Sequence, residues 1–281
     1  VFSFFWNAAL PQFEATTMNH LGDDLHRYSG IRLWGSIGFI IAVIGLGALL
    51  GESGTGLLPT VLMVLFALIW LSSLTVPESA AGHLPLDQEP LRKVLSQPVV
   101  LSLLAVCFLA QASHGPYYAF FSIYMQHYGY TTAVIGQLWA LGVIAEIGIF
   151  LLTPILLPRY GARKLLITAA ALTTLRWLLT ALFADRLAII IFSQTLHAAS
   201  FGLYHAVMIS LIHALFVGAH QGRGQALYSS ISFGAGGAVG ILVSGYLWTN
   251  MGPQAMYLVA ALTSLCALLV VIFALRNIPA S

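Results

Sequence analysis

Charged side chains are scarce in this sequence. Of its 281 residues only 7% are charged, whereas 59% are hydrophobic. An ordinary soluble domain has about 25% charged residues, and a soluble chain of this length would need more polar surface to cover its core. The composition therefore excludes a soluble globular domain and predicts a chain whose exterior faces lipid.

Cysteine is also scarce, and three common enzyme motifs are absent from the sequence. The two cysteines, Cys107 and Cys266, lie inside apolar runs without metal-site or disulfide spacing. There is no His-Glu-x-x-His, no Gly-x-Ser-x-Gly and no phosphate loop. We expect a protein that is not an enzyme and that has no cofactor, no metal ion and no nucleic-acid partner.

Long apolar runs are what the sequence does contain. A helix needs about 20 mainly apolar residues to cross the hydrocarbon core, and helices satisfy their own backbone hydrogen bonds there. Nine segments meet this requirement, so the sequence predicts an all-α, polytopic transmembrane bundle. The segments are 1–21, 31–50, 57–76, 99–126, 132–157, 165–183, 187–216, 225–248 and 254–275.

The loops between these segments alternate between basic and uncharged. Lysines and arginines gather on the cytoplasmic side of a membrane protein. The basic loops and the tail carry Arg27, Arg92, Lys93, Arg159, Arg163, Lys164, Arg223 and Arg276. The exception to the alternation is Arg186, beside Asp185, which lies in a loop where no basic residue is expected. This pattern predicts a multi-pass protein of a bacterial inner membrane, with a cytoplasmic C-terminus.

The polar connector 77–98 predicts how the chain is divided. It follows the third segment and precedes six more, whereas a transporter of two six-helix halves has such a linker after helix six. Nine helices with the C-terminus inside also put the first residue outside. We therefore expect residues 1–76 to be helices four to six, 77–98 to be the cytoplasmic linker and 99–281 to be the C-terminal half. Nine helices of a twelve-helix fold would be present, with three preceding Val1.

Four ionisable residues lie within or at the edge of the predicted spans: Glu14, Arg32, Glu146 and Arg176. A charge in the bilayer interior costs several kcal/mol unless it is paired or solvated in a cavity. Arg32 is one residue into its segment and could instead extend to the interface. The other three predict a polar cavity inside the bundle.

Two helical faces add polar and aromatic groups to this cavity. Gln194, His197, Phe201, Tyr204 and His205 share one face of their segment by spacing. A histidine ordinarily titrates near neutral pH, which would suit proton exchange at His197, although a packing role for a lone membrane histidine stays open. On the segment 99–126, a second face holds Gln111, His114, Tyr118 and Ser122, with Gly115 and Pro116 predicting a bend near the cavity.

These residues carry a family resemblance. Several short stretches occur in the same order as in one transporter family. They are 11–15 (PQFEA), 31–39 (IRLWGSIGF), the acid Glu146, the loop 159–164 (RYGARK), and the triplets 175–177 (LRW) and 195–197 (TLH). The sequence resembles the major facilitator superfamily, in the branch that contains lactose permease and the 3-phenylpropionate transporters. The resemblance implies that Glu14 and Arg32 hold the substrate and that Glu146, Arg176 and His197 take part in proton coupling.

Three departures from lactose permease bear on the substrate. Ser200 replaces an acid that carries the proton there, Gln194 replaces a lysine, and Phe39 replaces the tryptophan that stacks on galactose. These differences argue against a galactoside and leave the proton carrier open among Glu146, Glu14 and His197. They bring the sequence closer to the phenylpropionate transporters.

The sequence therefore predicts a monomeric, proton-coupled symporter of a small organic solute, with an aromatic carboxylate such as 3-phenylpropionate preferred. An oligosaccharide or nucleoside symporter is the alternative, and a remnant without activity is a third reading. The expected partners are the solute, protons and lipid. The candidate substrate-binding residues are Glu14, Arg32, Phe39, His114, Tyr118 and Gln194, and the candidate proton-coupling residues are Glu146, Arg176, His197 and His205.

Overall fold

The structure is a computed structural model. It describes residues 13, 16–17, 20–21, 30–31, 33–42, 55–76, 91–217, 220–276 and 278. Within these ranges every regular element is a helix, as the all-α prediction requires. Most of the first predicted span and residues 77–90 of the predicted linker lie outside the described residues.

Six helical segments of the described chain are long and apolar enough to cross a membrane. They are Pro98–His127, Thr132–Tyr160, Ala162–Leu182, Leu187–Leu215, Gln221–Met251 and Pro253–Ala274. These segments confirm the last six predicted spans to within a few residues. Two shorter apolar helices, Leu33–Ala42 and Pro59–Ser73, fall inside the second and third predicted spans.

Three of the six spans are interrupted. The first consists of α5 (Pro98–Ser113) and α6 (Gly115–His127). The fourth contains α9 (Leu187–Thr195), a π-helical segment (Ala198–Leu203) and α10 (Tyr204–Leu215). The fifth contains α11 (Gln221–Ser229), a second π-helical segment (Ser230–Gly236) and α12 (Gly237–Met251). The continuous spans are α7 (Thr132–Tyr160), α8 (Ala162–Leu182) and α13 (Pro253–Ala274).

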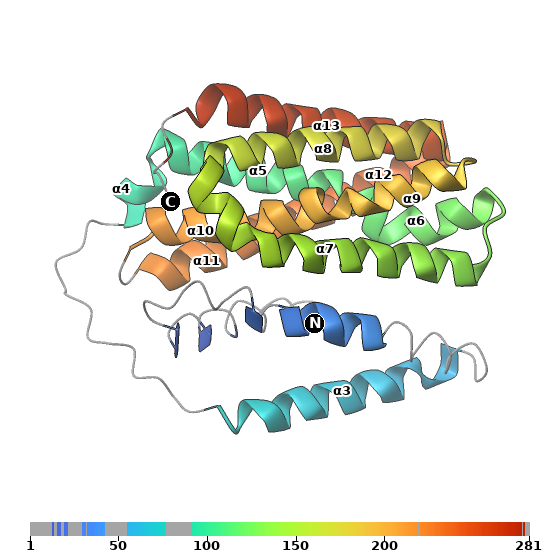
Figure 1. Ribbon diagram of the computed structural model, residues 1–281, viewed down its shortest axis with the longest axis horizontal. Helices are drawn as coiled ribbons and strands as arrows, with labels where there is room; N and C mark the ends of the chain where they lie inside the picture. The colour runs from blue at the N-terminus through green and yellow to red at the C-terminus, as the bar shows by residue number, and fades with distance from the viewer. Residues whose placement is uncertain are drawn as a thin grey trace.

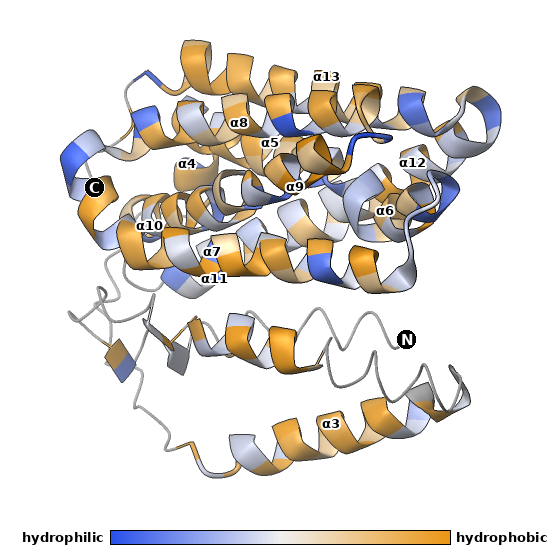
Figure 2. Cartoon of the chain, turned by 45° about the vertical axis from the view of Figure 1, so that its right-hand side comes forward, coloured by the Kyte–Doolittle hydropathy of each residue, from blue (hydrophilic) through white to orange (hydrophobic). Residues whose placement is uncertain are grey.

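These helices pack side by side into one bundle (Figure 1). α3 (Leu58–Ser73) and the helix Leu33–Ala42 lie below the bundle in both views, with Leu33–Ala42 on the side of α7. The short helix α4 (Leu91–Leu95) leads into α5. Apolar residues dominate the outer faces of the helices (Figure 2). Leu242 and Tyr246 of α12 are 73% and 67% exposed, as expected for side chains that face lipid.

The bend between α5 and α6 is stabilised by close backbone packing. Pro116 has no N–H for the helical ladder, so the helix is interrupted at His114, as the sequence predicted. A Cβ atom on Gly115 would lie 2.2 Å from the carbonyl carbon of Gly240, and one on Gly240 would lie 2.3 Å from the Ala112 oxygen. Glycine at both positions therefore lets α12 contact the bend directly.

Buried apolar residues form two clusters, one toward each end of the bundle. One cluster includes Leu166 of α8 and Val207 of α10, and the other includes Trp177 of α8 and Ile190 of α9. On α8 and on the span that contains α9 and α10, the polar residues around Arg176 lie between the residues of the two clusters. The polar residues around Arg176 are therefore flanked along the bundle by packed apolar side chains.

Seven of the nine lysines and arginines that the structure describes from Leu91 onward lie toward one end of the bundle. α4, the α7–α8 junction, the α10–α11 junction and the chain's C-terminus all lie at the left of Figure 1. Arg163 at this end donates to the Ile272 oxygen at 2.9 Å, near the end of α13. Asp185 and Arg186, which form an ion pair at 3.1 Å, lie in the α8–α9 junction at the other end.

Candidate functional site

The site is built around Arg176, which α8 places at the middle of the bundle with no solvent exposure. Its guanidinium donates from Nη1 to Ser200 Oγ at 2.8 Å and to His197 Nδ1 at 3.0 Å, and from Nη2 to Gln194 Oε1 at 3.2 Å. The ring of Tyr117 lies 4.2 Å from its Cζ atom. These contacts replace much of the hydration that a buried cation loses.

The contact with Arg176 determines the tautomer of His197. A guanidinium has only donors, so His197 Nδ1 must accept and the ring proton must be on Nε2. His197 Nε2 lies 3.3 Å from Glu146 Oε2 and therefore donates to this carboxylate. Ser36 donates to Glu146 Oε1, also at 3.3 Å. The result is a relay in which a neutral imidazole joins a buried cation to a buried acid.

A second layer of contacts holds this relay in place. Tyr117 donates its hydroxyl to Gln194 Oε1 at 3.0 Å, which orients the amide oxygen toward Arg176. Glycines let α7 approach the helices that carry the relay. A Cβ on Gly142 would touch Gln194 and His197, and one on Gly202 would lie 2.5 Å from Ile149 and 3.2 Å from Glu146 Cγ.

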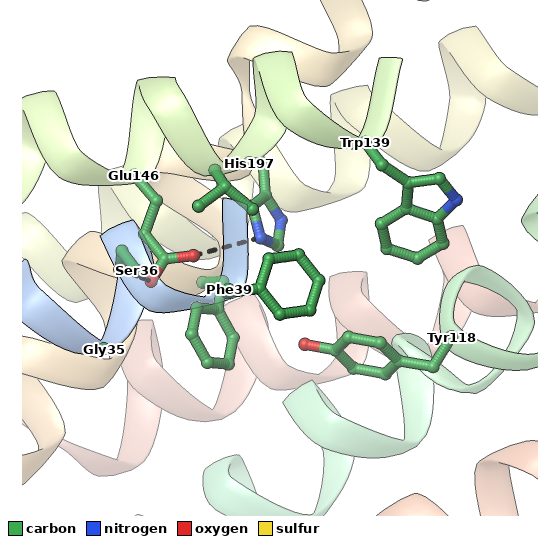
Figure 3. A pocket seen from close by; sticks show the side chains of 9 residues that line it. Gly35, Ser36, Phe39, Tyr118, Trp139, Glu146 and His197 are labelled. Carbon is green, nitrogen blue, oxygen red and sulfur yellow. Dashed lines mark hydrogen bonds and ion pairs between the residues drawn. The ribbon is translucent and has the colours of Figure 1, made fainter. Parts of the chain in front are cut away.

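Glu146 and His197 of this relay form one wall of a cavity of about 240 Å³. Figure 3 shows Glu146, His197 and Ser36 at one side and Trp139 and Tyr118 at the other, with Phe39 near the polar groups. The lining residues are Gly35, Ser36, Phe39, Tyr118, Trp139, Val143, Glu146, His197 and Phe201. A ligand in this cavity would meet a hydrogen-bonding end and an aromatic end.

The structure separates the predicted substrate-binding residues into three groups. Phe39 and Tyr118 line the cavity. Gln194 lies behind the wall, where it binds Arg176 and Tyr117. His114 is buried beside Tyr118, and its Nδ1 donates to the Ala110 oxygen at 2.8 Å. Glu14 and Arg32 lie outside the described residues.

Of the predicted proton-coupling residues, the structure joins Glu146, His197 and Arg176 and places His205 apart from them. The π-helical segment stacks the rings of His197 and Phe201 with centroids 5.5 Å apart, and those of Phe201 and His205 5.7 Å apart. His205 Nδ1 lies 2.8 Å from the Tyr228 hydroxyl. A phenyl ring that carries no exchangeable proton thus lies between the two histidines.

The face predicted for residues 194–205 needs one correction. The sequence placed Tyr204 with the polar stripe, but Tyr204 packs in the apolar cluster with Val207. The reason is the π-helical segment, whose wider turn shifts the register that an α-helix would have. The rings at positions 197, 201 and 205 align instead.

Sequence reasoning missed Trp139 and Ser36 as lining residues. Trp139 lies seven residues before Glu146, so both belong to one face of α7, and this spacing could have identified it. Ser36 offered no such signal, because its contact with Glu146 joins positions 110 residues apart.

Comparisons with known proteins bear on the family and the fold of this chain. The model of the MFS_1-like family matches residues 1–259. A protein of Escherichia coli (strain K12) described as a probable 3-phenylpropionic acid transporter is 30% identical over 275 residues, which cover 95% of this chain and 70% of that protein. The maltose permease of Geobacillus stearothermophilus is 27% identical over 277 residues, covering 95% of this chain and 68% of the permease.

A solved structure shares the fold. The crystal structure of the nucleoside transporter NupG (D323A mutant) superimposes with a TM-score of 0.69 over 94% of this chain and 72% of that chain, at 17% sequence identity. These matches confirm the helix bundle of the major facilitator type and the multi-pass membrane setting. The curated relatives are transporters and not enzymes.

Proposed function

The chain belongs to the MFS_1-like family, and we propose that it is a proton-coupled symporter that carries a small aromatic carboxylate across a bacterial inner membrane. The observation that carries this proposal is the Arg176–His197–Glu146 relay, which opens on an aromatic-lined cavity. The description of the E. coli relative as a probable 3-phenylpropionic acid transporter supports the same substrate class.

The proposed coupling rests on charge balance in the buried site. Arg176 carries a positive charge, and an ionised Glu146 compensates it through the neutral ring of His197. A substrate carboxylate that enters the cavity would place a second negative charge beside Glu146, and two close carboxylates do not both stay ionised. Binding of the anion is therefore linked to the uptake of one proton by Glu146.

The donor of His197 provides the place for the substrate carboxylate. Its Nε2–H faces the cavity side of the relay and donates to Glu146. Once Glu146 is protonated, the same Nε2–H can donate to the substrate carboxylate, which then becomes the counter-charge of Arg176. Arg176 itself is buried behind the wall and acts through His197. Arg32, outside the described residues, is the second candidate cation.

The cavity wall favours an aromatic solute over a sugar. Its side chains include four aromatic residues, Phe39, Tyr118, Trp139 and Phe201. Its other polar groups, those of Ser36, Glu146 and His197, already bind one another. A sugar site needs polar partners for many hydroxyls. An oligosaccharide or nucleoside stays the alternative, because maltose and nucleoside transporters are among the similar proteins.

The proposed orientation rests on the basic end of the bundle. Seven lysines and arginines of the described residues lie in the α4, α7–α8, α10–α11 and C-terminal regions. The positive-inside rule assigns this end to the cytoplasm. We propose the C-terminus there, with the protein acting as a monomer.

The test is solute-driven proton movement in proteoliposomes that contain the purified protein and a pH-sensitive dye. Addition of 3-phenylpropionate is expected to alkalinise the outer medium, whereas maltose and uridine are expected to have no effect. Proton movement with maltose or uridine alone would favour the alternative substrates. Uptake of 3-phenylpropionate without proton movement would overturn the coupling.

A further inference from the structure

Trp139 lines the cavity at the end opposite the relay, and contacts with three side chains orient its indole ring. Its indole Nε1–H donates to Ser122 Oγ at 3.1 Å. The centroid of the Tyr117 ring lies 4.4 Å from that of Trp139 at an interplanar angle of 40°, and the centroid of the Phe121 ring lies 5.5 Å away at 87°. Because Ser122 already accepts the only polar hydrogen of the indole, Trp139 presents a rigid apolar face to a ligand.

Tyr118 completes this end of the cavity. It comes from α6, is 42% exposed and lines the same cavity as Trp139. Figure 3 shows its ring on the same side of the view as Trp139, with the hydroxyl pointing toward the side where Glu146 and His197 lie. Two aromatic side chains from different helices thus border the space farthest from the relay.

The two ends of the cavity are separated by a fixed distance along α7. Trp139, Val143 and Glu146 follow i, i+4, i+7 spacing, and all three line the cavity. At a rise of 1.5 Å per residue, Trp139 and Glu146 are about 10 Å apart along the helix axis. The apolar side chain of Val143 lies between them. His197, where the carboxylate is proposed to bind, packs against α7 between these two levels, since a Cβ on Gly142 would lie 3.5 Å from its side chain. The ligand therefore spans less than this length, which suits a carboxylate joined to an aromatic ring by a short apolar chain.

We propose that Trp139 and Tyr118 form a ring-binding subsite that makes the protein select aromatic acids by the length of the chain between ring and carboxylate, with Ser122 as the residue that positions Trp139. This inference rests on the proposed function, since it assumes that a carboxylate is bound near His197. Acids whose ring is attached directly to the carboxylate are too short to reach both ends. Aliphatic acids reach the relay but have no ring to place on Trp139.

Equilibrium binding to the purified protein tests the subsite without any need for proton coupling. The panel is benzoate, phenylacetate, 3-phenylpropionate and the aliphatic acid hexanoate, each measured by calorimetry. The wild type is expected to bind 3-phenylpropionate most tightly. Trp139→Ala is expected to weaken binding of 3-phenylpropionate by about tenfold or more, to leave hexanoate within about twofold and to remove the preference for chain length. Trp139→Phe keeps a ring and is expected to lose less affinity than Trp139→Ala.

Ser122→Ala tests the positioning role. It is expected to weaken 3-phenylpropionate binding severalfold in the wild-type background and to have no further effect in Trp139→Phe, which has no indole N–H to orient. The matched control is Ser113→Ala, because Ser113 accepts the indole N–H of Trp177 at 3.3 Å and Trp177 does not line the cavity. This control is expected to keep the wild-type preference for chain length.

The outcomes separate this inference from the proposed function. If the wild type binds the aromatic acids but Trp139→Ala keeps both the affinity and the length preference, the subsite is wrong and the symporter proposal stands. If Ser122→Ala acts equally in the wild-type and Trp139→Phe backgrounds, Ser122 does not act through Trp139. If the wild type binds none of the acids, both the proposed substrate class and the ring-binding subsite are wrong.

Discussion

Replacing Glu146 by glutamine should separate substrate binding from proton coupling. Glutamine keeps the size of the side chain and accepts a hydrogen bond from His197 Nε2–H, as a protonated glutamate would. It cannot release a proton. We therefore expect Glu146→Gln to lose uphill accumulation of the substrate while it still exchanges substrate across the membrane.

The structure also predicts how far the affinity changes. The contacts of 3.0 Å between Arg176 and His197 and of 3.3 Å between His197 and Glu146 separate the two charges by one imidazole ring. At about 8 Å and an effective dielectric constant of about 20, opposite unit charges attract by about 2 kcal/mol. In Glu146→Gln this attraction becomes available to the substrate carboxylate, so its binding should tighten by up to about 30-fold.

The dependence of binding on pH gives a second measurement. In the wild type, binding of the anion takes up a proton on Glu146, so the apparent affinity should fall as pH rises, by up to about tenfold per pH unit. In Glu146→Gln no proton is taken up, and the affinity should stay constant over the same range. Calorimetry at several pH values measures both, and proteoliposomes with and without an imposed pH gradient measure accumulation and exchange.

His197→Gln is the matched control. A glutamine side chain offers one amide donor toward Glu146 and one oxygen acceptor toward Arg176, as the Nε2–H tautomer of His197 does, but it does not titrate. Accumulation should therefore survive in His197→Gln. The reasoning is refuted if Glu146→Gln still accumulates substrate and a protonophore still collapses that gradient. The reasoning is also refuted if His197→Gln abolishes accumulation. In either case, Glu14 and His197 would be the next proton carriers to test.

Three further outcomes are expected. Arg176→Lys should lower the thermal stability of the purified protein and abolish transport, because one ammonium cannot reach His197, Ser200 and Gln194 together as the guanidinium does; unchanged stability would contradict this. Gly115→Ala should destabilise the bundle by about 1–3 kcal/mol, since its Cβ would lie 2.2 Å from the α12 backbone, whereas Gly148→Ala, with no atom within 4 Å, should melt like the wild type. A reporter fused to the C-terminus should be cytoplasmic and a tag in the α8–α9 junction should be accessible from outside; the reverse pattern would overturn the orientation.

Much of the fold was readable from the sequence because a bilayer constrains it strongly. Each span must satisfy its own backbone hydrogen bonds over about 20 apolar residues, and the six spans from Pro98 onward appear where apolar length alone put them. The bend at Gly115 and Pro116 was equally local, since it depends on a missing N–H. The π-helical segments were not predicted. No local signal distinguishes residues 198–203 from an ordinary α-helix, and Tyr204 was therefore assigned to the wrong face.

The sequence by itself determined that this is a membrane protein and that Glu146, Arg176 and His197 carry groups too costly to leave unpaired in a bilayer. The tertiary structure decided which groups meet. Helical periodicity gives the face of each residue on its own helix but not the rotation of that helix against its neighbours. For this reason, only the packed bundle places Arg176 behind His197, Glu146 in front of it and Trp139 at the far end of the same cavity.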